Sequence, residues 1–453
     1  MSPPKKLPHQ LYIIHNLLFY NMKRILSVTT FLLIAIVAIA QQETTPFMRQ
    51  LMSLPGISDV QPLQSRSFKE KYVMKIQQNV DGDNASKGTF GQRIFVCMRD
   101  VNAPTVIVTE GYSASYGLNP GYEIELSRMF DANIVLCEYR YFDQSVPEPC
   151  NWDYMTVDNS LRDLHNVRQT LGQLFKGKWI STGTSKGGQT TMFYRVAYPD
   201  DVDASVSYVA PLNRGVEDGR HEVFLAKKAG TAEDRATVLA AQQEMLKRRA
   251  TIVPLFEKYC EQHNYHFYLP IEEIYDYVIL EYPFAHFQYG TPASSIPPLT
   301  ASDEELLNHF LRVSTPDYFA YPNKYLPFDV QAVRELGYYG YSLKGLKKWT
   351  KVKNTKGYLN KIMLTPELRH YKFDPTLYKR TVKFLKKEDP TMIFIYGEAD
   401  PWSASGVCTW LDCSKKENMR VYVQPGGDHG SNINHMPEPD KTDIINRLNK
   451  WLK

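Results

Sequence analysis

The sequence predicts an α/β fold in which a mostly parallel sheet is flanked by helices and interrupted by a long helical insertion. Two short apolar runs, 105–110 and 133–139, enclose a loop and a short helical stretch, as in a strand–helix–strand unit. A second unit follows at 157–182, where an amphipathic helix leads into another apolar run. Two more apolar runs, 391–397 and 420–425, come only after a long segment of different character.

The first strands are predicted to form a hairpin. The runs "YVMKIQQ" (72–78) and "RIFVCMR" (93–99) alternate polar with apolar residues or carry β-branched and aromatic ones. The turn-rich segment "DGDN" (81–84) lies between them. This pattern is typical of two antiparallel strands.

After the hairpin, strands alternate with helices, which predicts parallel pairing. "TVIVTE" (105–110) and "NIVLCEY" (133–139) are the first two of these strands, with a short helix expected near 126–130.

The next unit places a serine at the end of a strand. Apolar residues at helical spacing predict a helix over 157–174, and "KWIST" (178–182) is the strand after it. A helix that includes 192–197 ends before Pro199, and "ASVSYVAP" (204–211) is the following strand.

From 212 to 388 the sequence is rich in helical patterns, aromatic residues and proline. Thr231 with Asp234, and Ser302 with Glu305, have the spacing of helix starts. We therefore expect a helical cap inserted between strands of the sheet. The predicted parts are an N-terminal extension with a signal peptide (1–40), the two halves of the sheet domain (41–211 and 389–453) and the cap (212–388).

The N-terminal region has the pattern of a secretory signal. From Met22 the chain reads "MKRILSVTTFLLIAIVAIAQQ", in which a basic pair precedes an apolar run and small residues at Ala38 and Ala40. The apolar run is short for a membrane span and no basic flank follows it. We expect cleavage after Ala40 and a secreted or periplasmic protein without a stable membrane anchor.

Loss of the signal also changes the charge. Residues 1–40 contain four basic and no acidic side chains, so their removal takes the formal net charge from +4 to 0. Nothing then favours nucleic acid as a partner. No C-x-x-C spacing occurs, and we expect neither a metal nor another cofactor. The oligomeric state does not follow from the sequence.

Six cysteines, an even number in a chain expected to be exported, allow some disulfide pairing. Cys408 and Cys413 are near enough in sequence to close a small loop. Buried free thiols are the alternative for most of the six.

A serine between glycines follows the strand at 178–182. Residues 183–187, Gly-Thr-Ser-Lys-Gly, fit the pattern G-x-S-x-G. Residues without side-chain bulk permit a tight strand-to-helix turn that holds the serine where a substrate can reach it. Ser185 therefore has the setting of a nucleophile elbow.

Ser185, Asp400 and His429 occur in the order serine, acid, histidine, each after a predicted strand. This order is that of α/β-hydrolases, so we predict the α/β-hydrolase fold with an inserted helical cap. A serine hydroxyl is a weak nucleophile at neutral pH, so an imidazole must take its proton and a carboxylate must orient that imidazole. Glu398 and His435, which lie close by in sequence, are alternatives for the acid and the base.

An acyl-transfer intermediate also needs backbone N–H donors aimed at its oxyanion. One is expected from Lys186, directly after the nucleophile. The other is expected from the loop after "TVIVTE", at Gly111 or Tyr112.

Three segments carry a family resemblance. "CEYRYFDQSVPEP" (137–149), "DVQAVRELGYYGY" (329–341) and "GEADPWSASGV" (397–407) resemble signatures of the prolyl-specific serine carboxypeptidases and dipeptidyl-peptidase II. With "VTEGY", "GTSKGG" and "GGDHG", the arrangement is more similar to the related secreted tripeptidyl aminopeptidases. The resemblance implies a secreted serine exopeptidase that removes short peptides from a free N-terminus, often after proline. It places the triad at Ser185, Asp400 and His429.

One departure concerns the amine site. The dipeptidyl-peptidase signature G-N-E-G appears here as Val108-Thr109-Glu110-Gly111, without the asparagine. An ammonium near the nucleophile needs a carboxylate partner, and Glu110 is our hypothesis for it. A structural ion pair between Glu110 and Arg140 is the alternative. Trp402 and tyrosines of the cap are expected either to form an apolar wall for a proline ring or to serve in packing.

Two other function classes remain open. A carboxylic-ester hydrolase can use the same fold, although the sequence has no H-G-G-G motif. A non-catalytic binding protein can keep the fold without the activity, although this chain retains a serine, an acid and a histidine in order.

Overall fold

The computed structural model describes residues 44–453, which belong to two units that divide after Ser53. The described part of the first unit contains one short helix, α2 (Pro46–Ser53). The predicted signal peptide and its cleavage point after Ala40 lie outside the described residues. Within residues 44–453, no helix combines the length and the apolar character that crossing a bilayer requires.

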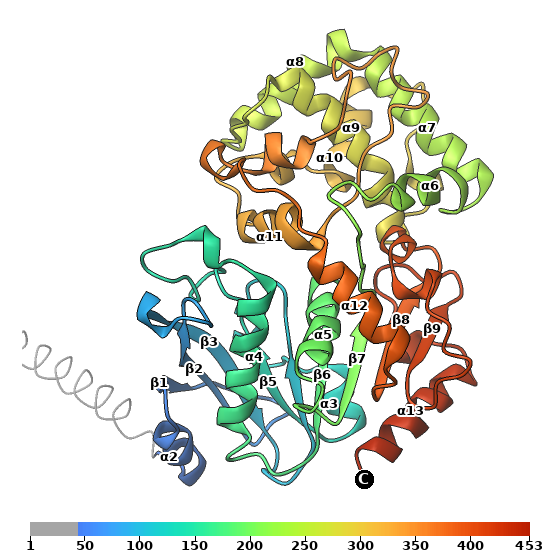
Figure 1. The fold of residues 1–453 in the computed structure, drawn as a ribbon. Coiled ribbons are helices and arrows are strands. Elements are labelled where there is room, and N and C mark those ends of the chain that lie inside the picture. The colour runs from blue at the N-terminus through green and yellow to red at the C-terminus, as the bar shows by residue number, and fades with distance from the viewer. Residues whose placement is uncertain (1–43) are drawn as a thin grey trace, which may run out of the picture. The chain divides into compact units, whose positions relative to one another are not determined.

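The second unit, residues 54–453, is built on one nine-stranded sheet (Figure 1). Its strands are β1 (Ile57–Pro62), β2 (Glu70–Asn79), β3 (Thr89–Met98), β4 (Thr105–Val108), β5 (Asn133–Cys137), β6 (Trp179–Thr184), β7 (Ala204–Tyr208), β8 (Met392–Gly397) and β9 (Arg420–Gln424). Their order across the sheet is β1-β2-β3-β5-β4-β6-β7-β8-β9. Pairing is antiparallel from β1 to β5 and parallel from β5 to β9.

The fold class is confirmed as an α/β-hydrolase fold, with a mostly parallel sheet flanked by helices. The predicted hairpin is β2 paired with β3, and the predicted strand–helix–strand units are also present. Strand β1 was not predicted. None of its residues is fully buried and it ends in a proline, so it lacks the apolar pattern by which the other strands are recognised.

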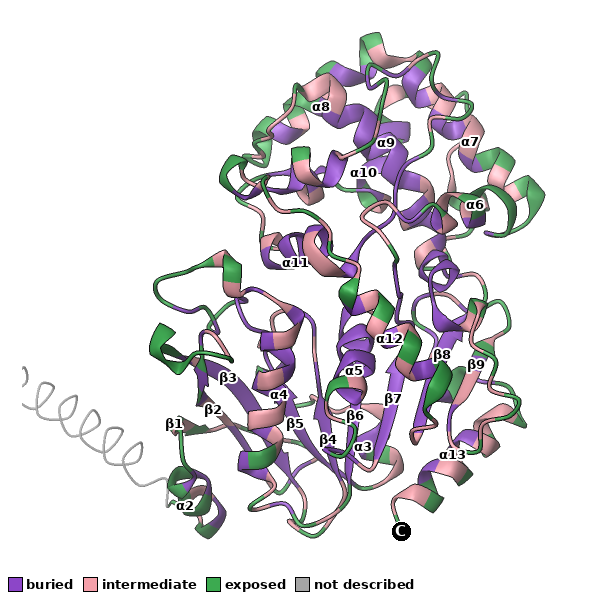
Figure 2. Cartoon of the chain, in the orientation of Figure 1, coloured by how far each residue is buried: buried purple, intermediate pink, exposed green. Residues whose placement is uncertain are grey.

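Helices cover both faces of the parallel strands. On one face, Leu126 of α3 (Glu125–Met129) and Ile444 and Leu448 of α13 (Asp440–Trp451) share a core with the strands. On the other, α5 (Lys186–Ala197) packs against α4 (Val157–Leu171) and α12 (Thr376–Lys387). Strands β4 to β8 are buried throughout except at Thr184 (Figure 2). Each large apolar side chain buried in this way contributes about 1.5–3 kcal/mol, so the strand ends are firmly positioned.

The segment between β7 and β8 is mainly helical. We call residues 212–388 the helical insertion, after the predicted cap; its helices are α6 (Arg220–Lys227), α7 (Ala232–Lys247), α8 (Arg249–Gln262), α9 (Ile271–Gln288), α10 (Asp303–Val313), α11 (Leu326–Gln331) and α12. The two predicted helix starts are confirmed, because Thr231 accepts the N–H of Asp234 at 3.0 Å and Ser302 accepts that of Glu305 at 3.2 Å.

Helices α6 to α10 gather beyond the edge of the sheet, whereas α12 lies beside the sheet (Figure 1). Helix α9 contacts α7, α8 and α10 and is buried over most of its length. Because α12 packs on α5, the last helix of the insertion belongs to the layer that covers the sheet. The limits at 212 and 388 remain a prediction.

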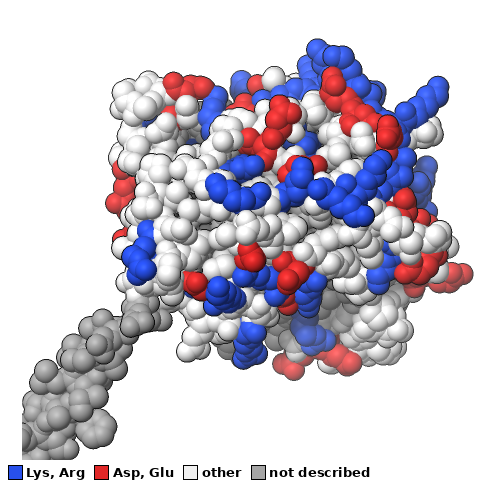
Figure 3. Space-filling model, turned by 90° about the horizontal axis from the view of Figure 1, so that it is seen from below, with Lys and Arg blue, Asp and Glu red and all other residues white. Residues whose placement is uncertain are grey.

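The described surface has charges of both signs. On the face in Figure 3, lysine and arginine side chains are interspersed with aspartate and glutamate. Such mixing is typical of an ordinary solvated surface.

The expectation of disulfide pairing is wrong in this structure, where all six cysteines are free. Cys97 and Cys137 are buried in β3 and β5, and burial raises the pKa of the Cys97 thiol to about 12. Cys408 donates from its thiol to the carbonyl of Ser403 at 3.5 Å and does not close a loop with Cys413.

Candidate active site

Ser185 occupies a tight turn between β6 and α5. Its backbone has φ +58° and ψ −119°, a region that residues with a side chain rarely adopt. A Cβ atom on Gly183 would lie 2.4 Å from the backbone of Gly187, so the turn requires a glycine at 183. The backbone N–H of Ser185 donates to the carbonyl of Tyr208 in β7 at 2.9 Å. The serine is thus held at the carboxyl edge of the parallel strands.

Asp400 and His429 follow β8 and β9 at the same edge of the sheet. The Nδ1 atom of His429 is 2.7 Å from Oδ2 of Asp400, and both side chains are buried. Oδ1 of Asp400 accepts the backbone N–H of Trp402 at 3.0 Å. Burial raises the pKa of Asp400, while the His429 imidazole and the Trp402 N–H oppose that rise. These contacts fix both the orientation and the tautomer of the imidazole.

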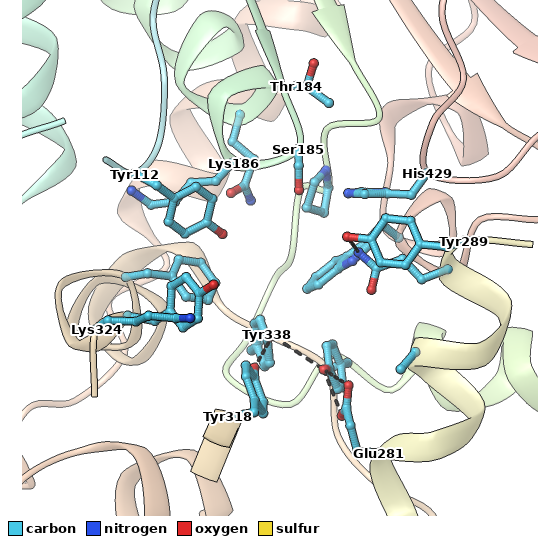
Figure 4. Close-up of a pocket in the computed structure, with 18 of the residues that line it drawn as sticks. Tyr112, Thr184, Ser185, Lys186, Glu281, Tyr289, Tyr318, Lys324, Tyr338 and His429 are labelled. Atoms are coloured by element: carbon cyan, nitrogen blue, oxygen red, sulfur yellow. Dashed lines mark hydrogen bonds between the residues drawn. The ribbon is translucent and has the colours of Figure 1, made fainter. Parts of the chain in front are cut away.

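The other ring nitrogen of His429 is directed toward Ser185. Nε2 is buried and has no hydrogen-bond partner within the described residues 44–453. Figure 4 shows the imidazole facing the Ser185 side chain. Both residues line one cavity of about 930 Å³. The structure therefore brings together the three residues predicted as the triad.

The two alternatives lie elsewhere. Glu398 is exposed, and its Oε2 accepts the backbone N–H of Gly426 at 2.9 Å. His435 is exposed, with Nδ1 3.1 Å from the side-chain amide nitrogen of Asn432. Neither residue lines the cavity that contains Ser185.

Lys186 joins the turn at Ser185 to the loop after β4. Its buried ammonium donates to the carbonyl of Gly111 at 2.6 Å and lies 3.4 Å from the centre of the Tyr139 ring. Burial lowers the pKa of this ammonium well below its usual value, and the Glu110 charge opposes that effect. The contact holds Gly111 beside Lys186, and Gly111 is followed directly by Tyr112, the other predicted oxyanion residue of this loop.

Glu110 lies at the cavity wall close to the turn at Ser185. Its carboxylate accepts the hydroxyl of Tyr116 at 2.6 Å. Burial raises the pKa of Glu110, and the hydrogen bonds from Tyr116 and from the backbone of Gly111 moderate the rise.

The alternative ion pair between Glu110 and Arg140 is wrong. The guanidinium of Arg140 instead binds both oxygens of Asp163, at 2.6 and 2.7 Å. Both side chains of that pair are buried, and the pair lies outside the cavity. Glu110 is therefore not neutralised by Arg140.

Trp402 belongs to an aromatic cluster, and of this cluster Trp402, Tyr338 and Tyr339 line the cavity. Its ring centre lies 4.9 Å from that of Phe284, 5.3 Å from that of Tyr338 and 5.2 Å from that of Tyr339. The two interpretations of Trp402 are compatible, because the ring packs in the cluster and also faces the cavity. This produces an apolar wall near His429, whose ring centre is 6.4 Å from that of Trp402.

Comparison of the sequence with known proteins shows its family. The sequence matches the family described as PS-10 peptidase S37 over residues 40–453. The chain belongs to the peptidase S37 family. It is a serine peptidase, a hydrolase of peptide bonds.

Individual relatives share less than a third of their residues with this chain. The S37 peptidase is 29% identical over 413 residues to a prolyl tri/tetrapeptidyl aminopeptidase of Streptomyces mobaraensis, covering 89% of this chain and 84% of the other. It is 25% identical over 162 residues to the human lysosomal Pro-X carboxypeptidase, covering 32% of each. Among solved structures, the proline iminopeptidase of Mycobacterium smegmatis aligns at 12% identity and a TM-score of 0.40, over 87% of this chain and 98% of the other.

Glu281, which also lines the cavity of this S37 peptidase, was not predicted from the sequence. It lies in α9 within the run "YVILEYPF", where it interrupts a sequence of apolar and aromatic residues. An acid in the buried part of a helix is unusual and signals a special environment. The aromatic residues around it were attributed only to the cap, because no local pattern shows which cavity the helix faces.

Proposed function

We propose that this S37 peptidase is a secreted exopeptidase that releases short peptides, chiefly tripeptides, from free N-termini. We further propose that it often cuts after proline and acts through an acyl-enzyme on Ser185. The contact between His429 and Asp400, with Nε2 directed toward Ser185, supports this function most strongly. The name of the Streptomyces relative supports the peptide length and the residue before the cut.

In the proposed mechanism, Nε2 of His429 takes the proton of Ser185 as Oγ attacks the scissile carbonyl carbon. The carbonyl oxygen becomes an oxyanion, which the N–H of Lys186 and an N–H from Gly111 or Tyr112 stabilise. The C–N bond then breaks, and the leaving amine receives the proton from His429.

Hydrolysis of the acyl-enzyme uses the same groups. His429 takes a proton from water, whose oxygen attacks the ester carbonyl. The ester C–O bond breaks, Oγ of Ser185 recovers the proton, and the short peptide leaves with a free carboxylate. Asp400 keeps its charge through both halves and stabilises the imidazolium in each.

Recognition of the substrate is proposed to use both walls of the cavity. The wall at Trp402 offers an apolar face to a proline ring. Glu110 is proposed to bind an ammonium close to the nucleophile, where burial makes an unpaired carboxylate costly. The N-terminal pattern supports secretion, and sequencing the N-terminus of the exported protein tests it.

A set of fluorogenic amides tests the proposed activity. We would compare Ala-Pro, Ala-Ala-Pro and Ala-Ala-Ala-Pro aminomethylcoumarin amides, each with a free and an acetylated N-terminus, on the wild type and on S185A. The proposal predicts hydrolysis of free-amine tripeptidyl substrates and none by S185A. If simple carboxylic esters tested beside these amides are cleaved and the amides are not, an ester hydrolase is favoured. If neither the esters nor the amides are hydrolysed, a binding protein is favoured.

The same substrates test Glu110. E110Q is expected to raise KM for the free-amine Ala-Pro amide, whose ammonium lies close to the nucleophile, much more than for its acetylated form. An equal change for both forms would refute the role of Glu110.

A further inference from the structure

A second carboxylate faces the cavity from the helical insertion. Glu281 lies in α9, is 8% exposed and lines the same cavity as Ser185. Its Oε1 accepts the hydroxyl of Tyr339 at 2.8 Å, and its Oε2 accepts the hydroxyl of Tyr341 at 2.7 Å. The side chain is therefore held in one orientation by neutral donors.

No cation accompanies this carboxylate. Among residues 44–453, Glu281 forms no ion pair, and the groups around it are hydroxyls of tyrosines whose pKa values are raised, namely Tyr318, Tyr338, Tyr339, Tyr341 and Tyr358. Burial raises the pKa of Glu281 to about 7, while the hydrogen bonds from Tyr341 and Tyr339 oppose the rise. Burying a carboxylate without a cation raises the free energy of the folded protein. A cationic ligand that pairs with this carboxylate would offset that cost and would therefore bind more tightly here.

Three other buried carboxylates of the same fold have such a partner, whereas the buried Asp329, which lies outside the cavity, accepts the side-chain amide of Asn323 at 2.6 Å. Asp163 binds Arg140, and Asp276 binds Arg249. Asp400 contacts the imidazole of His429. Glu281 differs from these three in lining the cavity while lacking a basic partner among the described residues.

Position along the cavity separates Glu281 from Glu110. Figure 4 shows Glu281 at the opposite end of the pocket from Ser185, with Tyr338 at an intermediate position. Glu110 instead adjoins the nucleophile turn, where its backbone is next to Gly187. An extended peptide advances about 3.3–3.6 Å per residue, so an ammonium at Glu281 lies more residues from the scissile bond than one at Glu110.

We propose that Glu281 binds the N-terminal ammonium of the longer substrates and thereby sets the length of the peptide released. The released peptide is then a tripeptide or longer when the ammonium reaches Glu281, and shorter when it pairs with Glu110. The wall beside Glu281 is aromatic, because the Tyr339 ring stacks on Tyr338 at 4.2 Å and on Phe284 at 3.7 Å between ring centres. This inference rests on the proposed exopeptidase function.

The substitution E281Q tests it on the six amides described above. The kcat/KM for free Ala-Ala-Pro and Ala-Ala-Ala-Pro amides is expected to fall roughly 10- to 100-fold, since a hydrogen bond between charged groups is lost. The acetylated forms, and the free Ala-Pro amide, are expected to change by less than about twofold. A loss that is equal on free and acetylated substrates would show a structural role and overturn the proposal. So would an equal loss on dipeptidyl and tripeptidyl amides.

Glu335 supplies a matched control. Burial raises its pKa to about 7 as well, but it accepts the backbone N–H of Val157 at 3.2 Å and lies outside the cavity of Ser185. E335Q therefore removes a comparable carboxylate, and it is expected to leave the ratio of free to acetylated hydrolysis unchanged. A change in this ratio equal to that of E281Q would overturn the proposal.

A second variant covers the case in which E281Q does not fold. E281D keeps the charge and withdraws it by one methylene group. The proposal requires a larger loss for the free tripeptidyl amide than for its acetylated form, and an equal loss overturns it. Failure of the proposed function looks different, because the wild type would then release no peptide from any amide or S185A would remain active.

Discussion

At the scale of single residues, the proposed nucleophile depends on a backbone that few residues tolerate. Ser185 has φ +58°, and the turn that imposes this angle leaves no space for a side chain at Gly183. Lys186 follows directly in the same turn, and its ammonium donates to the carbonyl of Gly111 in the neighbouring loop. The position of the hydroxyl is thus set by the turn before any substrate binds.

Gly183→Ala is expected to disturb this turn. The added Cβ would meet the Gly187 backbone at 2.4 Å, and such overpacking costs roughly 1–3 kcal/mol. Urea unfolding and kcat on the tripeptidyl amide are both expected to report the change. Gly219→Ala is the control, since nothing lies within 4 Å of its Cβ position and its φ is −62°. An unaltered stability and rate for Gly183→Ala would contradict the described turn.

Asp400→Asn is expected to lower kcat by roughly 10³- to 10⁴-fold with little change in KM, because the imidazole loses both its orienting acceptor and the charge that stabilises the imidazolium. Stability is expected to hold, since burial raises the pKa of Asp400 and the amide removes a buried charge. Glu398→Gln is the matched control and should retain near-normal kcat. A loss below tenfold for Asp400→Asn would argue against its role.

At the scale of elements, a buried ion pair connects the ends of β2 and β5 with α4. Arg140, just after β5, binds Asp163 of α4. It also donates to the carbonyls of Asn79 and Val80 at the end of β2. One guanidinium thus ties two strands to a helix, and it is completely enclosed.

Asp163→Ala is expected to destabilise the fold by about 3–5 kcal/mol, because it leaves a buried guanidinium without its counter-charge. Urea unfolding measures the loss. The double variant R140M/D163A also removes the positive charge, and it is expected to recover part of the lost stability. A double variant less stable than Asp163→Ala would show that the carbonyl contacts of Arg140 matter more than its charge.

Elements with strong local patterns could be predicted from the sequence. The strands β4, β5 and β8 are continuous apolar runs, and the starts of α7 and α10 carry their own capping residues. The serine, acid and histidine were found because each follows a predicted strand. Strand β1 was missed, since it is half exposed and pairs with β2 only through the tertiary fold.

At the scale of the whole molecule, the cavity is assembled from segments far apart in the chain. Ser185 comes from the sheet and Glu281 from α9, while Tyr338 and Tyr339 follow α11. The sequence contains each of these residues but gives no sign that they meet. Glu281 could not be predicted for this reason, because its burial and its missing counter-charge are properties of the assembled fold.

The buried charge at Glu281 is expected to lower stability at high pH. Its folded-state pKa of about 7 exceeds the ordinary value of 4.5, so its stabilising contribution is complete below about pH 4.5 and is lost as the pH rises through 7. Glutamine imitates the protonated form at every pH. E281Q is therefore expected to exceed the wild type by under about 1 kcal/mol at pH 5 and by about 3 kcal/mol at pH 8.

Urea unfolding at the two pH values, without substrate, measures this difference. A constant gap between E281Q and the wild type would show that Glu281 does not titrate in this range. A gap that widens would mean that the fold keeps a destabilising acid in its cavity, as expected for a group retained for binding.

The backbone N–H of His429 donates to the carbonyl of Gln288 at 2.8 Å, which joins the end of α9 to the loop that carries the imidazole. Transplanting the insertion of another S37 peptidase would therefore replace Glu281 and also the Gln288 carbonyl that accepts the N–H of His429. A chimera designed for a new product length needs graft junctions that preserve this one carbonyl. Without it, the altered selectivity would come with slower turnover.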